Sequence, residues 1–71
     1  MTLTDMNQAI RGYIRELYNV EYNKKLEIER LESGGFKASF YMRNSEFPFV
    51  LIADLPEKEF LKYVYNELRK R

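Results

Sequence analysis

The sequence predicts a small α+β domain with the element order helix, three strands, helix. Two stretches near the ends of the chain carry apolar residues at helical spacing, and three stretches between them carry apolar residues at strand spacing or in short unbroken runs. Turn-forming residues separate the strands. The chain has 71 residues, enough for one domain with one core, so residues 1–71 are expected to form a single α+β domain.

The first helix is expected from about Thr4 to Tyr18. Thr2 or Thr4 can cap its start, and Asn19 can end it in a left-handed conformation. A second interpretation continues this helix to Leu31, but Lys24 would then interrupt the apolar stripe, so strands are preferred after Asn19. The residues of the stripe are Met6, Ala9, Ile10, Tyr13, Ile14, Leu17 and Tyr18.

Three strands are expected at 26–29, 36–43 and 47–53, joined as an antiparallel meander. A two-residue turn at 44–45 would place Phe40 opposite Phe49. A three-residue turn at 33–35, with Gly35 left-handed, would place Ile28 opposite Phe40 and Leu26 opposite Met42. The face expected to meet the helices then carries Phe36, Ala38, Phe40, Met42, Phe47, Phe49, Leu51 and Ala53.

The second helix is expected from about Pro56 to Lys70, with Asp54 as an acidic cap. Its apolar stripe can cover the sheet together with the first helix, so both helices are predicted to pack on one face. The stripe contains Phe60, Leu61, Val64, Tyr65 and Leu68.

Composition argues against catalysis. The chain contains neither His nor Cys, so it lacks the commonest general base, the thiol nucleophile and the usual zinc ligands. Its carboxylates fall at polar strand positions, at helix starts or on polar helix faces. It also lacks a glycine-rich phosphate loop. We therefore expect a non-enzymatic protein with no catalytic residues, no metal site and no cofactor.

Charge and hydropathy restrict the location and the partners. The net charge is +1, which gives no field that would steer the chain to nucleic acid or to a membrane. No apolar run approaches the roughly 18 residues that span a bilayer, and the start of the chain lacks the pattern of a signal peptide. A cytoplasmic location is expected. Asn, Lys, Glu, Ile and Tyr are frequent, a composition typical of AT-rich bacterial or phage genomes.

The outer face of the sheet is the predicted interaction site. Both helices are needed to cover the inner face, so no element remains to cover the outer one. Exposed apolar side chains in one patch tend to mark interaction sites. The sequence thus predicts an interaction module whose partner is another protein or a second copy of the chain. The predicted contact residues are Leu31, Lys37, Tyr41, Val50 and Ile52.

The alternative function is a nucleic-acid-binding or regulatory domain. Tyr41 could stack on a base, and Arg69, Lys70 and Arg71 could contact phosphate. The element order resembles that of the double-stranded-RNA-binding domain. That family binds RNA with a His-containing loop after its first strand and a Lys-rich start of its second helix. Here the loop is Ser-Gly-Gly and the helix opens Pro-Glu-Lys-Glu, whose acids repel phosphate. The resemblance therefore carries over no functional residues.

Overall fold

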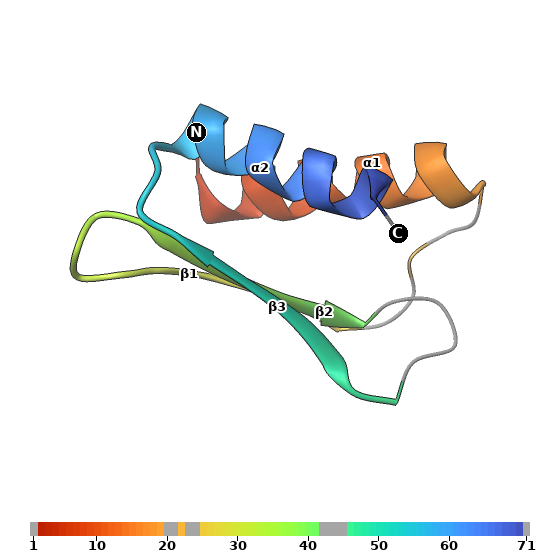
Figure 1. Cartoon of the computed structure of the whole chain (residues 1–71), viewed down its shortest axis with the longest axis horizontal. Helices are drawn as coiled ribbons and strands as arrows, with labels where there is room; N and C mark the ends of the chain where they lie inside the picture. The colour runs from red at the N-terminus through yellow and green to blue at the C-terminus, as the bar shows by residue number, and fades with distance from the viewer. Residues whose placement is uncertain (1, 20–21, 23–24, 42–45, 71) are drawn as a thin grey trace.

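The computed structural model describes residues 2–19, 22, 25–41 and 46–70 and confirms the predicted fold class. The three strands form an antiparallel sheet with the order β1-β2-β3. Both helices lie on the same side of this sheet, side by side, and α1 also contacts β1 (Figure 1). The elements are α1 (Leu3–Tyr18), β1 (Leu26–Arg30), β2 (Phe36–Tyr41), β3 (Pro48–Ala53) and α2 (Glu57–Arg69).

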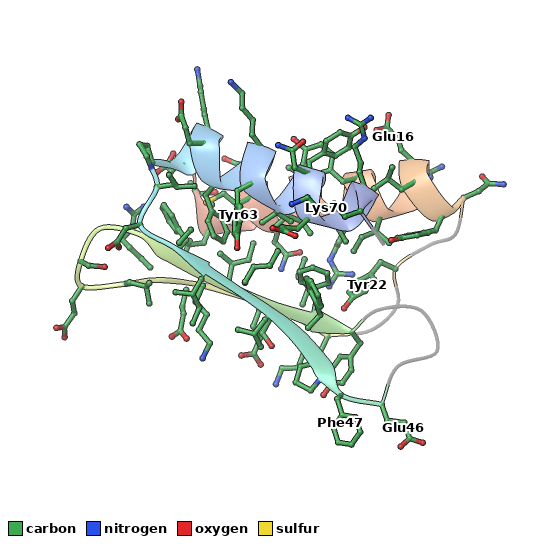
Figure 2. The ribbon with its side chains drawn as sticks, viewed as in Figure 1. Glu16, Tyr22, Glu46, Phe47, Tyr63 and Lys70 are labelled. Atoms are coloured by element: carbon green, nitrogen blue, oxygen red, sulfur yellow. The ribbon has the colours of Figure 1, made fainter. Side chains whose placement is uncertain are left out.

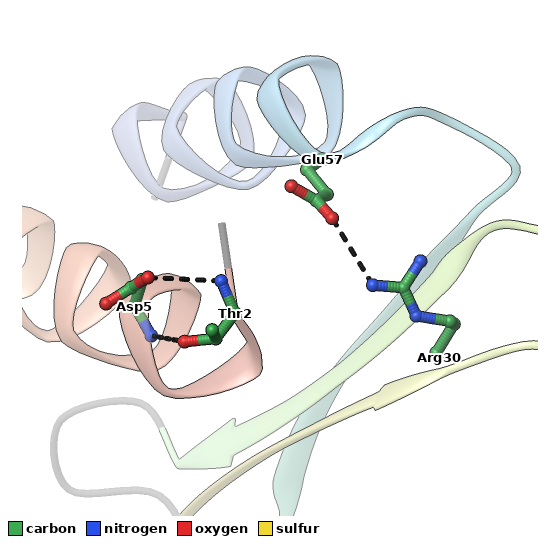
Figure 3. Close-up of polar contacts among 4 residues, drawn as sticks. All are labelled: Thr2, Asp5, Arg30 and Glu57. Atoms are coloured by element: carbon green, nitrogen blue, oxygen red, sulfur yellow. Dashed lines mark hydrogen bonds and ion pairs between the residues drawn. The ribbon is translucent and has the colours of Figure 1, made fainter.

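Local side-chain chemistry sets both ends of α1. The Thr2 hydroxyl accepts a hydrogen bond from the Asp5 N–H, and the Asp5 carboxylate accepts one from the Thr2 N–H, each at 3.1 Å (Figure 3). These two hydrogen bonds favour the charged carboxylate and lower the pKa of Asp5. Asn19 is left-handed, with φ of 54°, and its N–H donates to the Arg15 carbonyl. The helix therefore ends at Tyr18, and its continuation to Leu31 is excluded.

The start of α2 differs from the expectation. Pro56 occupies the N-cap position and provides no side-chain hydrogen bond. Helical backbone torsions are disfavoured for Leu55, because it precedes a proline. The helix therefore starts after Pro56, and Asp54 lies too early in the chain to cap its first amides. The Asp54 carboxylate instead accepts a hydrogen bond from the Ser33 hydroxyl of the first hairpin. Glu57, in the first turn, pairs with Arg30 of β1 at 3.3 Å (Figure 3).

The second hairpin has the predicted register and the first does not. Phe40 lies opposite Phe49, with ring centroids 5.5 Å apart. Ile28, however, lies opposite Ala38 rather than Phe40, a shift of two residues. An even shift keeps every side chain on its face, so Leu26 still points inward. The pairing expected for Met42 falls outside the described residues.

The shift arises in the loop between β1 and β2. The Gly34 N–H donates to the Leu31 carbonyl, and the Leu31 N–H donates to the Gly35 carbonyl. The three-residue loop is thus 32–34, one residue earlier than expected. Its left-handed residue is Gly34, with φ of 99°, and not Gly35.

Gly35 is required for a different reason. It is buried, and a Cβ atom there would overlap the Ala53 carbonyl oxygen and lie 2.6 Å from the Asp54 Cα. The backbone of the first hairpin therefore packs directly on the backbone at the end of β3. Only glycine leaves room for this approach.

The core lies between the sheet and the two helices. Phe36 and Phe60 join the two layers with ring centroids 5.5 Å apart, and Tyr13 and Tyr65 join the helices at 4.6 Å. Its buried members are Met6, Ile10, Ile14, Leu26, Phe36, Ala38, Phe40, Leu51, Phe60, Leu61, Val64 and Leu68. Neither described helix is long and apolar enough to cross a membrane.

Phe47 does not join this core, although the sequence placed it on the inner face. Its side chain is 76% exposed and points away from the helical layer (Figure 2). The ladder of β2 and β3 ends at the pair of Tyr41 with Pro48, so the strand alternation does not extend to Phe47.

We expect Phe40→Ala to lower the free energy of unfolding by about 3–5 kcal/mol, because it empties a fully buried site on the central strand. The matched control is Phe47→Ala, which removes the same atoms from an exposed site and should change stability by less than about 1 kcal/mol. Urea denaturation of both variants measures the difference. Equal losses would contradict the placement of Phe40 in the core and of Phe47 at the surface.

The glycines give a second test. Gly12 is exposed within α1 and has open space where a Cβ would lie, so Gly12→Ala should stabilise the domain by about 0.5–1 kcal/mol. Gly35→Ala should destabilise it by about 1–3 kcal/mol or more, because backbone atoms of β3 must move. Thermal melts of the two variants should therefore shift in opposite directions. A Gly35→Ala variant as stable as the wild type would refute the close contact with β3.

Candidate interaction surface

The outer sheet face is arranged in rows across the three strands. In one row, Glu29 of β1 lies opposite Lys37 of β2, which lies opposite Ile52 of β3. In the next row, the residues are Glu27, Ser39 and Val50. Tyr41 and Pro48 form the last described pair. The face is therefore acidic along β1 and apolar along β3.

The acidic side is paired with lysines. The Glu29 carboxylate lies 3.6 Å from the Lys37 ammonium, and the Glu27 carboxylate lies 2.6 Å from the Lys25 ammonium. The hydrogen bond and charge of Lys25 lower the pKa of Glu27, and the same pair raises the pKa of Lys25. These groups are well exposed to water, so the pairs add little stability. Because Lys37 pairs with Glu29 on β1, its charge lies toward the acidic side of the face.

The apolar side contains exposed residues of β3. Val50 is 43% exposed and Ile52 is 58% exposed, and both project from the outer face of β3. Phe47 precedes the same strand and also points away from the helices (Figure 2). We call Phe47, Val50 and Ile52 the β3 apolar strip. Two of these side chains lie on β3 and the third directly precedes it, and the run 47–53 contains no charged residue. Exposed apolar side chains gathered in this way are typical of a contact surface.

The backbone of β3 also faces an open edge. The bond from the Leu31 N–H to the Gly35 carbonyl shows that Gly35 directs its polar groups to β1. Because hydrogen-bonded and non-bonded pairs alternate in antiparallel ladders, 37 and 39 also bond to β1, and 36, 38 and 40 bond to β3. Val50 and Ile52 therefore direct their N–H and C=O groups outward. Within the described ranges, no hydrogen-bond partner reaches these groups.

The edge of β1 is closed by α1. The Asn7 amide donates to the outward carbonyl of Leu26 at 3.0 Å, and Asn7 in turn accepts from the Arg11 guanidinium at 2.7 Å. Arg11 also donates to the Tyr22 carbonyl and lies over the Tyr22 ring, 5.2 Å from its centroid. The Tyr22 hydroxyl accepts from the Tyr41 N–H at 2.7 Å and donates to the Lys25 carbonyl at 3.0 Å. This network ties α1 to the ends of β1 and β2.

An open cleft of about 740 Å³ runs along the same edge, between the first half of α1 and β1. Its polar lining includes Asn7 and Arg11, which already belong to the network, and the paired Glu29 and Lys37. No polar or charged side chain in the described part of the chain is buried. The described residues also form no group of three or more carboxylates that could hold a metal ion.

The predicted contact residues do not all come together. Lys37, Tyr41, Val50 and Ile52 lie on the outer face, where the alternation of β2 and β3 places them. Leu31 is half-buried at the hairpin end of β1, on the other side of β2 from Ile52.

Arg69 and Lys70, two of the three basic residues predicted to contact phosphate, lie at the end of α2, away from the outer sheet face. The Lys70 ammonium is 3.6 Å from the Glu67 carboxylate (Lys70 is labelled in Figure 2), and the Arg69 guanidinium lies 5.7 Å from the Tyr65 ring centroid. Arg71 is outside the described residues.

Sequence reasoning missed Phe47 as a surface residue. The signal that could have found it is Pro48, because a strand often begins at proline and the residue before it then lies outside the alternation. It also missed the Tyr22 network, which joins residues up to 19 positions apart. No periodic pattern marks such contacts.

Comparison with protein-family models, with curated proteins and with solved structures found no match to this chain.

The Tyr22 network predicts an alkaline limit to stability. Burial raises the pKa of Tyr22 above its ordinary value of 10.0, so on raising the pH the unfolded chain loses this proton first. The stability that the neutral phenol contributes is fully present below pH 10 and is lost as the pH rises through the folded pKa. Tyr22→Phe should remove this contribution and cost about 1–2 kcal/mol at neutral pH through two lost hydrogen bonds.

Spectrophotometric titration of the phenols tests this prediction. The difference between wild type and Tyr22→Phe should show one tyrosine that ionises above pH 10. Tyr63→Phe is the control, because within the described residues its hydroxyl makes no hydrogen bond and its ring packs beside Phe60. A Tyr22 phenol that ionises at or below its ordinary value would contradict the effect of burial on its pKa.

Proposed function

We propose that this chain is a small non-enzymatic protein-interaction module that binds its partner through the outer sheet face, along β3. The observation that carries the proposal is the β3 apolar strip, in which Val50 and Ile52 lie on an edge strand whose outward backbone groups are open and Phe47 directly precedes that strand. Burying apolar side chains supplies affinity in the centre of an interface, and exposed aromatic residues are frequent anchors. Backbone groups at an open edge can add the directional hydrogen bonds of an added strand.

The charges support a protein partner over nucleic acid. Lys37 and Lys70 lie next to Glu29 and Glu67, and Arg69 lies against an aromatic ring. Binding to nucleic acid needs several cations that can neutralise phosphates together. The first turn of α2, with Glu57 and Glu59, adds negative charge at the helix end where an anion would otherwise bind.

Site-specific photocrosslinking in the host of the protein tests the proposal. Benzoylphenylalanine in place of Phe47 keeps an aromatic side chain in the strip, and the same residue in place of Lys62, exposed on α2, is the control. We expect discrete protein adducts at position 47 and none at position 62. Val50→Lys with Ile52→Lys should abolish the adducts while the variant remains folded, because both side chains are exposed and outside the core.

The proposal fails if position 47 gives no protein adduct beyond the control, or if the adducts persist in the double-lysine variant while it remains folded. An adduct to nucleic acid in place of protein would support the alternative function.

A further inference from the structure

The two edges of the sheet are chemically unlike. Along β1, charged residues alternate with apolar ones, and the Asn7 amide donates a hydrogen bond to the outward carbonyl of Leu26. Along β3, the run 47–53 contains no charged residue. Natural proteins usually protect an exposed edge strand with charges, and lysine is the commonest. The edge of β3 lacks that protection, and the β3 apolar strip lies beside it.

We propose that the occupant of this edge is a second copy of the chain, whose β3 pairs with the first β3 antiparallel about a two-fold axis. This inference rests on the proposed function and names its partner. A two-fold contact brings each residue near the same residue of the second copy. A charged strand would therefore face side chains of the same charge. If β1 instead paired with β1 of the second copy, Glu27 and Glu29 would each lie near the glutamates of that copy. β3 avoids this repulsion, because it joins two three-stranded sheets through uncharged side chains only.

Backbone chemistry selects the register. Pro48 has no N–H, so a register with Val50 opposite its own copy would place Pro48 opposite Ile52 and leave the Ile52 carbonyl without a donor. With Val50 opposite Ile52 of the second copy, each hydrogen-bonded pair exchanges both N–H···O bonds and Pro48 stays outside these pairs. On the outer face, the two valines and two isoleucines then pack in one cluster, as β-branched cross-strand neighbours do.

The same features stop the assembly at two copies. Once the β3 edges have paired, the edges left are those of β1. These carry Lys25, Glu27, Glu29 and Arg30 on or beside the strand, and the Asn7 hydrogen bond already occupies one outward carbonyl. A two-fold contact is also closed, since each copy uses the same surface. The assembly is a dimer and not a fibre.

Analytical ultracentrifugation and amide hydrogen exchange test the inference together. We expect the wild type to sediment at twice the 8.6 kDa of one chain. In the dimer, the amides of Val50 and Ile52 should exchange as slowly as that of Leu51, which bonds to β2 within one copy. Dilution to monomer should restore fast exchange at 50 and 52 but not at 51. A wild type that stays monomeric at millimolar concentration, or a dimer with fast exchange at 50 and 52, would overturn it.

A pair of charge variants tests the register. Val50→Lys with Ile52→Lys gathers like charges and should abolish the dimer. Val50→Lys with Ile52→Glu places each lysine opposite a glutamate of the second copy and should keep it. If both variants are monomeric while folded, or if both remain dimeric, the proposed register is wrong. A wild-type monomer whose Phe47 adducts contain another protein would refute the dimer and leave the proposed function intact.

Discussion

The packing of one face of β2 is the constraint on which the rest of the structure depends. Phe36, Ala38 and Phe40 are buried between the sheet and the helices, and their neighbours on both flanking strands are set by the pairing of β2. Because side chains alternate along a strand, burying these three forces Lys37 and Ser39 to the outside. The same alternation decides which backbone groups of β3 face the open edge. The core and the candidate surface therefore both follow from which side chains of β2 face inward.

The sheet protects one edge and leaves the other available, and the difference arises from what each edge contacts. α1 lies along β1 and provides Asn7 and Arg11, whose amide and guanidinium hold the strand and the segment before it. β3 runs on into the short connection to α2, and the absence of a side chain at Gly35 lets the first hairpin lie close to the start of this connection. An interaction along β3 therefore needs no rearrangement of the core, because its donors and acceptors already point outward.

The spacing of apolar residues in the sequence predicted the features of the fold that depend on local pattern. The stripes of the two helices, the inner residues of β2 and the exposure of Val50 and Ile52 all follow from spacing in the sequence. Spacing does not specify how a loop closes, so the register predicted for the first hairpin differs from the observed one by two residues, and the predicted left-handed glycine lies one residue after the observed one. Nor could it reveal Phe47 as exposed, since that depends on where the ladder ends. Contacts such as Tyr22 with Tyr41 require the fold itself.

The two helices run in the same direction, and this has a consequence for rearranging the chain. Their starts lie together beside the first hairpin (Figure 1). Near their ends, the Tyr18 hydroxyl donates a hydrogen bond to the Leu68 carbonyl at 3.2 Å. The start of α1 and the end of α2 are therefore separated by about the length of α2, roughly 20 Å for its 13 residues. A circular permutant would need a linker of at least about six extended residues to join them. Because the linker would start near α2 and return along the helical layer, the open edge of β3 would stay uncovered.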